Sequence, residues 1–428
     1  MRIGVVDDRV ARSAREGASP SVPADVGPAY ARLLLGALVA EGDTAIPWLP
    51  PTDSIRHRLA GVLDGVVPGT VVPPAEPKPA DGANRSGGST PIHGSNPADA
   101  ANQGASTTPA DGADPAASRG STPTVAPDAE PDVVVDTGPR APVGNWLPRR
   151  KAVPSDVPVI GIVDASFFGR TRDGWRRRVS VEVKRRFCRS VDALVCDLPS
   201  TIEAVGDLLA AGRPAPRTLL ARPGVDRRPD AADVTESRVR ERARSGPLDV
   251  ASVGPVVRSA GVLELVTGLE RLTADWRLTV AGDLSADPEY VDRVRAALVD
   301  LDLEGRVRIA GDVDDETLAA TLASAHAFAA PTLAGGDGVA LVDALSFGLA
   351  VVASEDGPGA DLLTHRRDGL LVDPTDEGEI TDALAPLCHD RERLARLGAD
   401  ALATARDLPT WGETATAVRA FVHDRLRD

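Results

Sequence analysis

The chain has 428 residues, 42% of them hydrophobic, which is enough for two or three domains with sizeable cores. Its formal net charge of −15 and its three lysines argue against nucleic-acid binding, because the composition lacks the basic excess that phosphate backbones attract. The sequence contains no run of 18 or more apolar residues, so no membrane-spanning helix is expected.

The composition also indicates the surroundings of the protein. Residues 1–17 form a short apolar run followed by charges, without the apolar core of a signal peptide. The three cysteines have neither metal-binding spacing nor even pairing, which favours a reduced, cytoplasmic setting. An acid-rich, lysine-poor surface stays hydrated in concentrated salt, so we interpret the chain as salt-adapted.

The first half predicts alternating strands and helices interrupted by one long insertion. Residues 1–8 read as a buried strand, and residues 27–43 as a helix that ends at Gly42. Residues 73–131 are dominated by Pro, Ala, Gly, Ser, Thr and Asp, and this composition predicts disorder because little apolar surface can be buried. Further strands are expected in three segments after the insertion: 132–138, 157–165 and 191–199.

A second alternating series follows a polar stretch at residues 227–246. Its expected strands are 248–254, 276–282, 306–311, 327–332, 349–354 and 369–374, with helical patterns between them and an amphipathic helix at the end of the chain. We therefore expect an α/β protein of two doubly wound, Rossmann-like domains facing across a cleft. The expected parts are an N-terminal domain (1–226, with the insertion 73–131), a C-terminal domain (247–408) and a terminal helix that packs back on the first domain (409–428).

With these elements placed, the sequence "GGDGVALVDALSFGLAVVAS" at residues 335–354 resembles a motif of family 4 of the retaining glycosyltransferases, which have the GT-B fold. Five more segments resemble that family in the right order: 191–212, 219–226, 249–269, 306–332 and 369–380. The resemblance implies that a sugar passes from a nucleotide-sugar donor, bound by the C-terminal domain, to an acceptor on the N-terminal domain. It also implies retention of configuration and no metal or other cofactor.

The phosphate-binding loop departs from the family pattern. The family's Arg and Lys positions are Pro255 and Ala260 in this chain, and no lysine follows Lys184. Gly254 opens the loop, and Arg258 is the cation within it that could bond a diphosphate with both arms of its guanidinium. The alternative is that Arg258 is a solvated loop residue.

The glycine turn departs as well. The family's paired glutamates fall at Gly335 and Asp343, so one carboxylate is lost and the other is one methylene shorter. Gly335, Gly336 and Gly338 are expected to approach the donor phosphates at a helix start, and Asp343 to accept hydrogen bonds from ribose hydroxyls. Alternatively, the glycines serve only a tight turn and Asp343 is an exposed helix residue. Asp337 adds a carboxylate that would repel a diphosphate unless it points away.

Asp164 is the candidate on the acceptor side. The family often carries a histidine at the end of the strand matched here by residues 157–165, and this chain has Asp164 there. An aspartate at that place can still accept a proton or a hydrogen bond from a sugar hydroxyl.

A basic segment at residues 167–190 runs against the acidic background. Its apolar residues recur at every fourth position, which predicts an amphipathic helix. The plainer interpretation is a core-packed helix with a solvated basic face, and the sharper one is a site for an anionic lipid-linked acceptor or a membrane surface. The cationic residues concerned are Arg176, Arg177, Arg178, Lys184, Arg185, Arg186 and Arg189.

The leading functional hypothesis is a retaining glycosyltransferase that uses a nucleotide sugar and an unidentified, possibly lipid-linked acceptor. The alternative is a catalytically degenerate relative that acts as a binding or partner subunit, which the lost Arg, Lys and Glu favour. An epimerase or phosphorylase of similar fold is a further alternative.

Overall fold

The protein is described by a computed structural model, which covers residues 1–6, 29–40, 44–47, 132–136, 156–168, 174–210, 215–244, 246–336 and 338–425. The predicted disordered insertion at 73–131 lies outside the described residues, as does Asp337. Two six-stranded sheets form the framework, and both are parallel throughout. The predicted pair of doubly wound Rossmann-like units is therefore confirmed.

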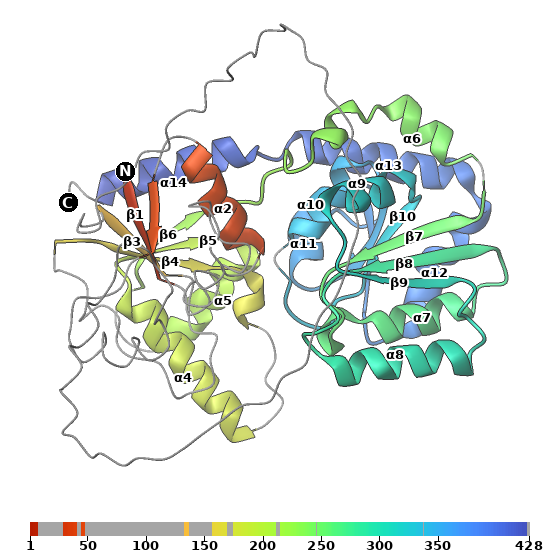
Figure 1. The fold of residues 1–428 in the computed structure, drawn as a ribbon, viewed down its shortest axis with the longest axis horizontal. Coiled ribbons are helices and arrows are strands. Elements are labelled where there is room, and N and C mark those ends of the chain that lie inside the picture. The colour runs from red at the N-terminus through yellow and green to blue at the C-terminus, as the bar shows by residue number, and fades with distance from the viewer. Residues whose placement is uncertain are drawn as a thin grey trace, which may run out of the picture. The chain divides into compact units, whose positions relative to one another are not determined.

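The first sheet has the strand order β2-β1-β3-β4-β5-β6 (Figure 1). Its strands are β1 (Arg2–Val6), β2 (Thr44–Pro47), β3 (Val133–Asp136), β4 (Val159–Val163), β5 (Ala193–Cys196) and β6 (Arg217–Leu220). The two edge strands, β2 and β6, were not among the predicted strands. Each has only four residues, and β6 has no fully buried position, so neither carries a strong apolar pattern.

Helices cover both faces of the first sheet. One face packs against α2 (Ala29–Ala40) and α14 (Trp411–Arg425), and the other against α4 (Gly174–Ser190) and α5 (Pro199–Leu209). Alternate strand residues serve the two faces: Val133 and Val135 belong to the first core and Val134 to the second. The last helix of the chain thus completes the core of the first sheet, where the rings of Trp411 and Tyr30 lie 5.9 Å apart.

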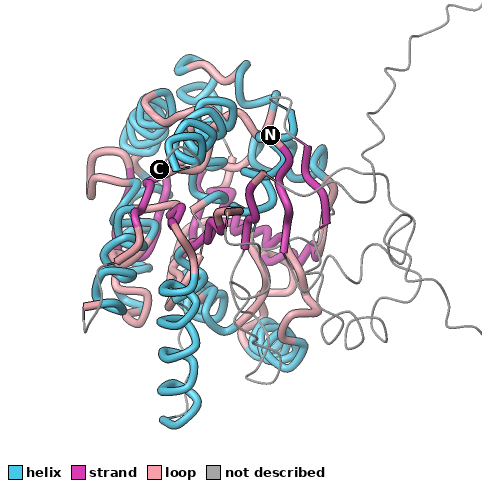
Figure 2. The backbone as a smooth tube through the Cα atoms, turned by 90° about the vertical axis from the view of Figure 1, so that its left-hand side faces the viewer, coloured by secondary structure: helices cyan, strands magenta, loops and turns pink. Residues whose placement is uncertain are grey.

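The second sheet has the order β12-β11-β10-β7-β8-β9. Its strands are β7 (Leu248–Val253), β8 (Trp276–Ala281), β9 (Val307–Gly311), β10 (Ala327–Ala330), β11 (Ala350–Ser354) and β12 (Gly369–Val372). Helices α7 (Val262–Glu270), α8 (Pro288–Asp300) and α12 (Glu377–His389) pack on one face. Helices α9 (Asp315–Ser324), α10 (Val339–Ser346) and α11 (Pro358–Leu362) pack on the other (Figure 1). In Figure 2 the helices flank the strands.

The polar stretch between the predicted domains carries a helix of its own, α6 (Glu236–Arg242), which packs against α13 (Arg391–Arg406). The guanidinium of Arg242 donates to the carbonyls of Phe347 and Gly348, 3.0 and 2.7 Å away, at the end of α10. These bonds satisfy carbonyl groups that a helix end leaves without partners. The connection from the first sheet is therefore anchored to the α10 side of the second sheet.

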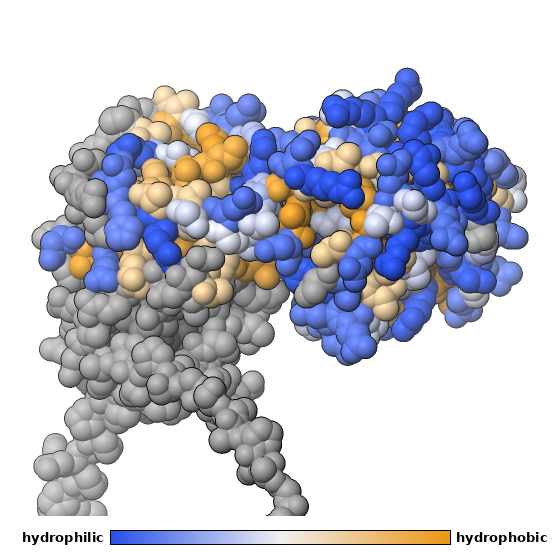
Figure 3. All heavy atoms as spheres, turned by 90° about the horizontal axis from the view of Figure 1, so that it is seen from above, coloured by the Kyte–Doolittle hydropathy of each residue, from blue (hydrophilic) through white to orange (hydrophobic). Residues whose placement is uncertain are grey.

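On the face drawn in Figure 3, hydrophilic residues predominate over the second sheet, whereas apolar residues are also exposed over the first. The hydrophilic surface over the second sheet agrees with the acidic composition of the chain. The described ranges contain no helix that combines the length and the apolar composition needed to cross a membrane.

Candidate functional site

The glycine turns of the second sheet lie at the carboxyl ends of its strands, as the sequence predicts. Gly254 follows β7 and Gly282 follows β8, with φ values of 145° and 146°. A Cβ atom on Gly282 would lie 2.0 Å from the carbonyl oxygen of Gly254. The two turns can touch only because Gly282 carries no side chain.

Arg258 lies in the loop that Gly254 opens, in a short 3₁₀ turn over Arg258–Ala260. Its side chain is exposed, and it makes no hydrogen bond or ion pair with any residue that the structure describes. The neighbouring carbonyl of Ser259 accepts the N–H of Leu333 at 2.8 Å. This bond joins the loop of Arg258 to the segment that leads into the second glycine turn.

The second glycine turn forms the start of α10. Gly335, Gly336 and Gly338 have φ values of 82°, 104° and 70°, which glycine adopts most readily. Gly338 is the N-cap of α10 and has no side chain with which to cap it. The helix therefore starts where the sequence predicts, and the approach of an anion to this start stays a prediction.

The same turn packs against the first sheet. A Cβ atom on Gly335 would lie 3.7 Å from the Cα of Ser166, and one on Gly338 would lie 3.5 Å from Leu198 Cδ1. Ser166 and Leu198 come shortly after β4 and β5. The structure thus brings the predicted donor-side turn together with the segment that carries Asp164.

Asp164 is buried at the carboxyl end of β4, where its Oδ1 accepts the hydroxyl of Ser166. Two further buried aspartates lie at the carboxyl ends of the neighbouring strands: Asp136 is the last residue of β3, and Asp197 follows β5. Asp197 accepts the N–H of Ala165 at 3.2 Å. Sequence reasoning missed Asp136 and Asp197, although each stands directly at the end of a predicted strand, as Asp164 does.

Tyr30, on α2, interacts electrostatically with Asp164 and Asp197 of this group. Its hydroxyl donates to the carbonyl of Ala221. Burial, followed by the charges of Asp197, Cys196 and Asp164, raises the pKa of Tyr30 well above its usual value, so the phenol is protonated at neutral pH. The carboxyl edge of the first sheet therefore offers carboxylate acceptors beside a phenol that stays neutral.

Asp343 is buried on α10, so its interpretation as an exposed helix residue is wrong. Arg227 and Arg228, from the segment after β6, donate to its Oδ2 from 3.1 and 3.2 Å. Both arginines escaped the sequence analysis because they lie 116 and 115 residues from Asp343 along the chain. A ribose hydroxyl that bonds the Asp343 carboxylate would therefore share it with the guanidinium groups of Arg227 and Arg228.

A second contact joins the two sheets at α5 and α11. The backbone N–H of Ser200 donates to both carboxylate oxygens of Asp361, each 3.2 Å away, and its hydroxyl donates to Oδ2. Ser200 is the second residue of α5, whose N-cap Leu198 cannot cap it. Asp361 therefore caps a helix of the first sheet from the side of the second.

The described part of the basic helix α4 supports a packed helix with charged residues on its outer face. Phe187 is buried, while Arg186 and Arg189 are exposed. Arg185 and Arg186 each pair with Glu182 at 2.9 Å. The ammonium of Lys184 lies 5.6 Å from the ring of Phe167. The side chains of Arg176, Arg177 and Arg178 lie outside the described residues.

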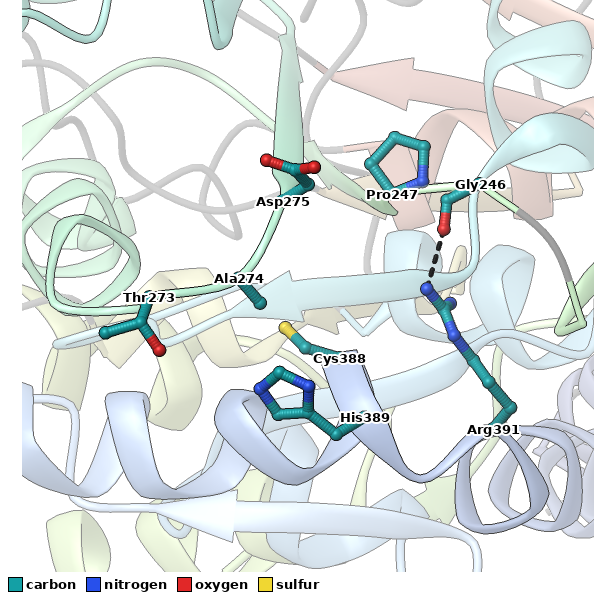
Figure 4. A pocket seen from close by; sticks show the side chains of 8 residues that line it. All are labelled: Gly246, Pro247, Thr273, Ala274, Asp275, Cys388, His389 and Arg391. Atoms are coloured by element: carbon teal, nitrogen blue, oxygen red, sulfur yellow. Dashed lines mark hydrogen bonds between the residues drawn. The ribbon is translucent and has the colours of Figure 1, made fainter.

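A surface depression of about 410 Å³ lies at the other end of the second sheet, before β7 and β8 (Figure 4). There the guanidinium of Arg391 donates to the carbonyl of Gly246 at 2.6 Å. The residues that line the depression are Gly246, Pro247, Thr273, Ala274, Asp275, Cys388, His389 and Arg391. The depression is therefore separate from the glycine turns.

No group of three or more His, Cys, Asp or Glu among the described residues could hold a metal ion.

Residues 233–403 match the family model of glycosyl transferases group 1. A D-inositol 3-phosphate glycosyltransferase of Xylanimonas cellulosilytica is 32% identical over 240 residues, which are 53% of this chain and 55% of that protein. A GDP-mannose-dependent alpha-(1-6)-phosphatidylinositol monomannoside mannosyltransferase of Mycobacterium tuberculosis is 30% identical over 190 residues, 41% of this chain and 48% of that protein. The chain spans about half the length of these curated relatives.

Solved structures resemble the chain over a larger share of its length. The sucrose-phosphate synthase of Thermosynechococcus elongatus superposes with a TM-score of 0.58 at 18% identity, covering 69% of this chain and 74% of that one. The Anabaena protein HepE, in complex with UDP and glucose, superposes with a TM-score of 0.54 at 18% identity, covering 68% and 78%. These likenesses show that the chain has the GT-B fold.

Proposed function

We propose that this protein is a retaining glycosyltransferase that moves a sugar from a nucleotide-sugar donor to a hydroxyl acceptor. The observation that carries the proposal is the glycine turn at Gly335–Gly338, which starts α10 and packs against the ends of β4 and β5. A donor bound at the turn would have its diphosphate at the start of a helix and its sugar next to the first sheet. The match of residues 233–403 to glycosyl transferases group 1 supports this assignment.

The chemistry of the transfer divides between the two sheets. The leaving diphosphate carries the charge that must be neutralised, and Gly254, Arg258 and the glycine turn are the donor-side groups proposed for it. Asp343 is proposed to lie beside the ribose. Asp164, at the end of β4, is proposed to accept a hydrogen bond from a hydroxyl of the acceptor or the transferred sugar. We propose that the reaction requires no metal, so chelation by EDTA should leave its rate unchanged.

The proposal is tested by a thermal-shift screen against nucleoside diphosphates and nucleotide sugars in molar salt, the medium that the acidic composition favours. A ligand at a hundred times its dissociation constant should stabilise the protein by about 2.7 kcal/mol. Incubation of the stabilising nucleotide sugar with polyol acceptors should then release the nucleoside diphosphate.

The substitution Arg258→Ala tests whether the ligand found in the screen binds at the loop that contains Arg258. Loss of a charge-assisted bond should weaken nucleoside diphosphate binding roughly tenfold to a hundredfold, since such bonds contribute about 1.5–3 kcal/mol. Arg277→Ala is the matched control, because Arg277 is also exposed but lies on β8. If the protein binds no nucleotide, the glycosyltransferase hypothesis is refuted and the alternative of a non-catalytic relative takes its place.

The acceptor is proposed to be a polyol that carries phosphate or lipid. The names of the relatives state inositol phosphate and phosphatidylinositol monomannoside as acceptors of those proteins. The exposed Arg186 and Arg189 on α4 would meet the anionic part of such an acceptor, or the surface of an inner membrane face that holds it.

Charge reversal on α4 tests this surface. We expect Arg186→Glu with Arg189→Glu to weaken binding to anionic vesicles, measured by co-sedimentation, by roughly thirtyfold or more, since each basic residue near such a surface contributes about 1 kcal/mol. The assay uses the lowest salt at which the protein stays folded, because salt screens this attraction. The matched control is Arg277→Glu with Arg308→Glu, which makes the same charge change at exposed positions on the second sheet. Equal binding by wild type and both variants would leave α4 with a solvated basic face only.

A further inference from the structure

Two consecutive arginines converge on one buried carboxylate at the carboxyl edge of the second sheet. Besides Asp343, Arg228 bonds Asp315 at the start of α9: its Nη1 donates to the carbonyl at 2.9 Å and its Nη2 to Oδ1 at 3.1 Å. All three nitrogens of the Arg228 guanidinium therefore have acceptors, and its side chain is only 3% exposed. Arg228 is a structural member of this cluster.

Among the described residues, the buried part of the cluster contains two guanidinium groups and one carboxylate. The side chain of Asp343 is 4% exposed, whereas that of Asp315 is 88% exposed, so water screens the charge of Asp315. Two guanidinium groups thus share one buried carboxylate oxygen. An excess cation removed from water is costly unless an anion compensates it. A further anion bound beside these guanidinium groups would therefore be electrostatically favourable.

Arg227 is the member of the cluster that can reach such a group. Its side chain is 19% exposed, and only Nη1 makes a hydrogen bond to a described residue, the one to Asp343. Its Nη2 lies 3.7 Å from Asp315 Oδ1, which is an ion pair without a hydrogen bond. A guanidinium has five N–H donors, so Arg227 keeps donors for a ligand while Asp343 holds it in place.

We propose that Arg227 is a donor-binding residue that bonds the diphosphate of the nucleotide sugar, with Asp343 as its positioning residue. The inference rests on the proposed function. Asp343 follows Gly338 by five residues, about 7.5 Å along the axis of α10, so Arg227 stands within one and a half turns of the predicted phosphate site. It would replace the cations lost at Pro255 and Ala260, and the diphosphate would be the further anion beside the two guanidinium groups.

The test measures, by titration calorimetry on the whole chain, the affinity for the nucleoside diphosphate that the screen selects and for its parent nucleoside. Arg227→Ala should weaken diphosphate binding roughly tenfold to a hundredfold and leave nucleoside binding unchanged. Arg227→Lys keeps the charge but loses the planar fork, so a smaller loss is expected for the diphosphate alone. Arg240→Ala, which removes an exposed arginine paired with Glu236 on α6, should change neither affinity.

The outcomes separate this inference from the proposed function. Wild type that binds no nucleotide would overturn both. Wild type that binds, with Arg227→Ala equal to it, would overturn the role of Arg227 and leave the proposed function standing. An equal loss for nucleoside and diphosphate would also overturn it, because the residue would then act on the structure alone. If Arg227→Ala does not fold, the diphosphate-to-nucleoside ratio of Arg227→Lys decides, and an unchanged ratio refutes the inference.

Discussion

Replacing Gly261 by alanine is expected to lower the free energy of unfolding by about 4 kcal/mol or more, which is at the upper end of single-residue effects. Gly261 precedes α7 in the left-handed region, with φ 72°. A Cβ atom there would lie 2.0 Å from the carbonyl oxygen of Pro331. The substitution therefore adds a collision between the new Cβ atom and the carbonyl of Pro331 to the usual cost of a left-handed alanine.

The collision should also reach the candidate site. Pro331 leads into the glycine turn, so its displacement would move Gly335–Gly338. Nucleotide binding should be lost together with stability. Chemical denaturation and the nucleotide thermal-shift assay measure the two effects on the same sample.

Gly246→Ala is the matched control for this prediction. Gly246 has a similar φ of 81°, but nothing lies within 4 Å of a Cβ placed on it. It should cost only the backbone strain of about 1–2 kcal/mol. The difference between the two variants isolates the close approach at Pro331. Equal destabilisation would mean that the loop at Gly261 can give way and that the turn does not depend on it.

Asp164→Asn is expected to lower the rate of sugar transfer by about two to four orders of magnitude while leaving donor affinity unchanged. The carboxylate is buried at the end of β4 beside the glycine turn, and asparagine has the same shape but a weaker acceptor. The measurement is the initial rate of nucleoside diphosphate release from the nucleotide sugar found in the screen. Calorimetry with the nucleoside diphosphate checks the affinity.

Asp192→Asn provides the comparison for the rate effect. The carboxylate of Asp192 accepts the N–H of Val159 at 2.8 Å, at the amino ends of β4 and β5, away from the glycine turn. Its loss should cost stability without slowing transfer more than about twofold. If Asp164→Asn transfers sugar at the rate of wild type, the proposed role of Asp164 as an acceptor of a hydroxyl hydrogen bond is refuted.

Local patterns in the sequence were enough to predict both sheets and the glycine turns. The strands of the second sheet are short apolar runs, such as 349–354, and amphipathic helices separate them, so each element is marked by residues close to one another. The glycines at 254, 335, 336 and 338 stand where such runs end, and their positive φ values follow from the turns required there. The edge strands β2 and β6 were not predicted because a run of four residues carries little pattern.

Only the tertiary structure decided which charged groups meet. Asp343 occurs in the sequence as an ordinary helix aspartate, yet it pairs with arginines 116 and 115 residues earlier in the chain. The return of α14 to the first sheet, where Trp411 meets Tyr30, is another contact between distant parts of the chain. Hydrophobic periodicity specifies which face of an element is buried, but not which distant element covers it. The partners of a buried charge are therefore set by how the layers pack, and this chain's site depends on such pairings.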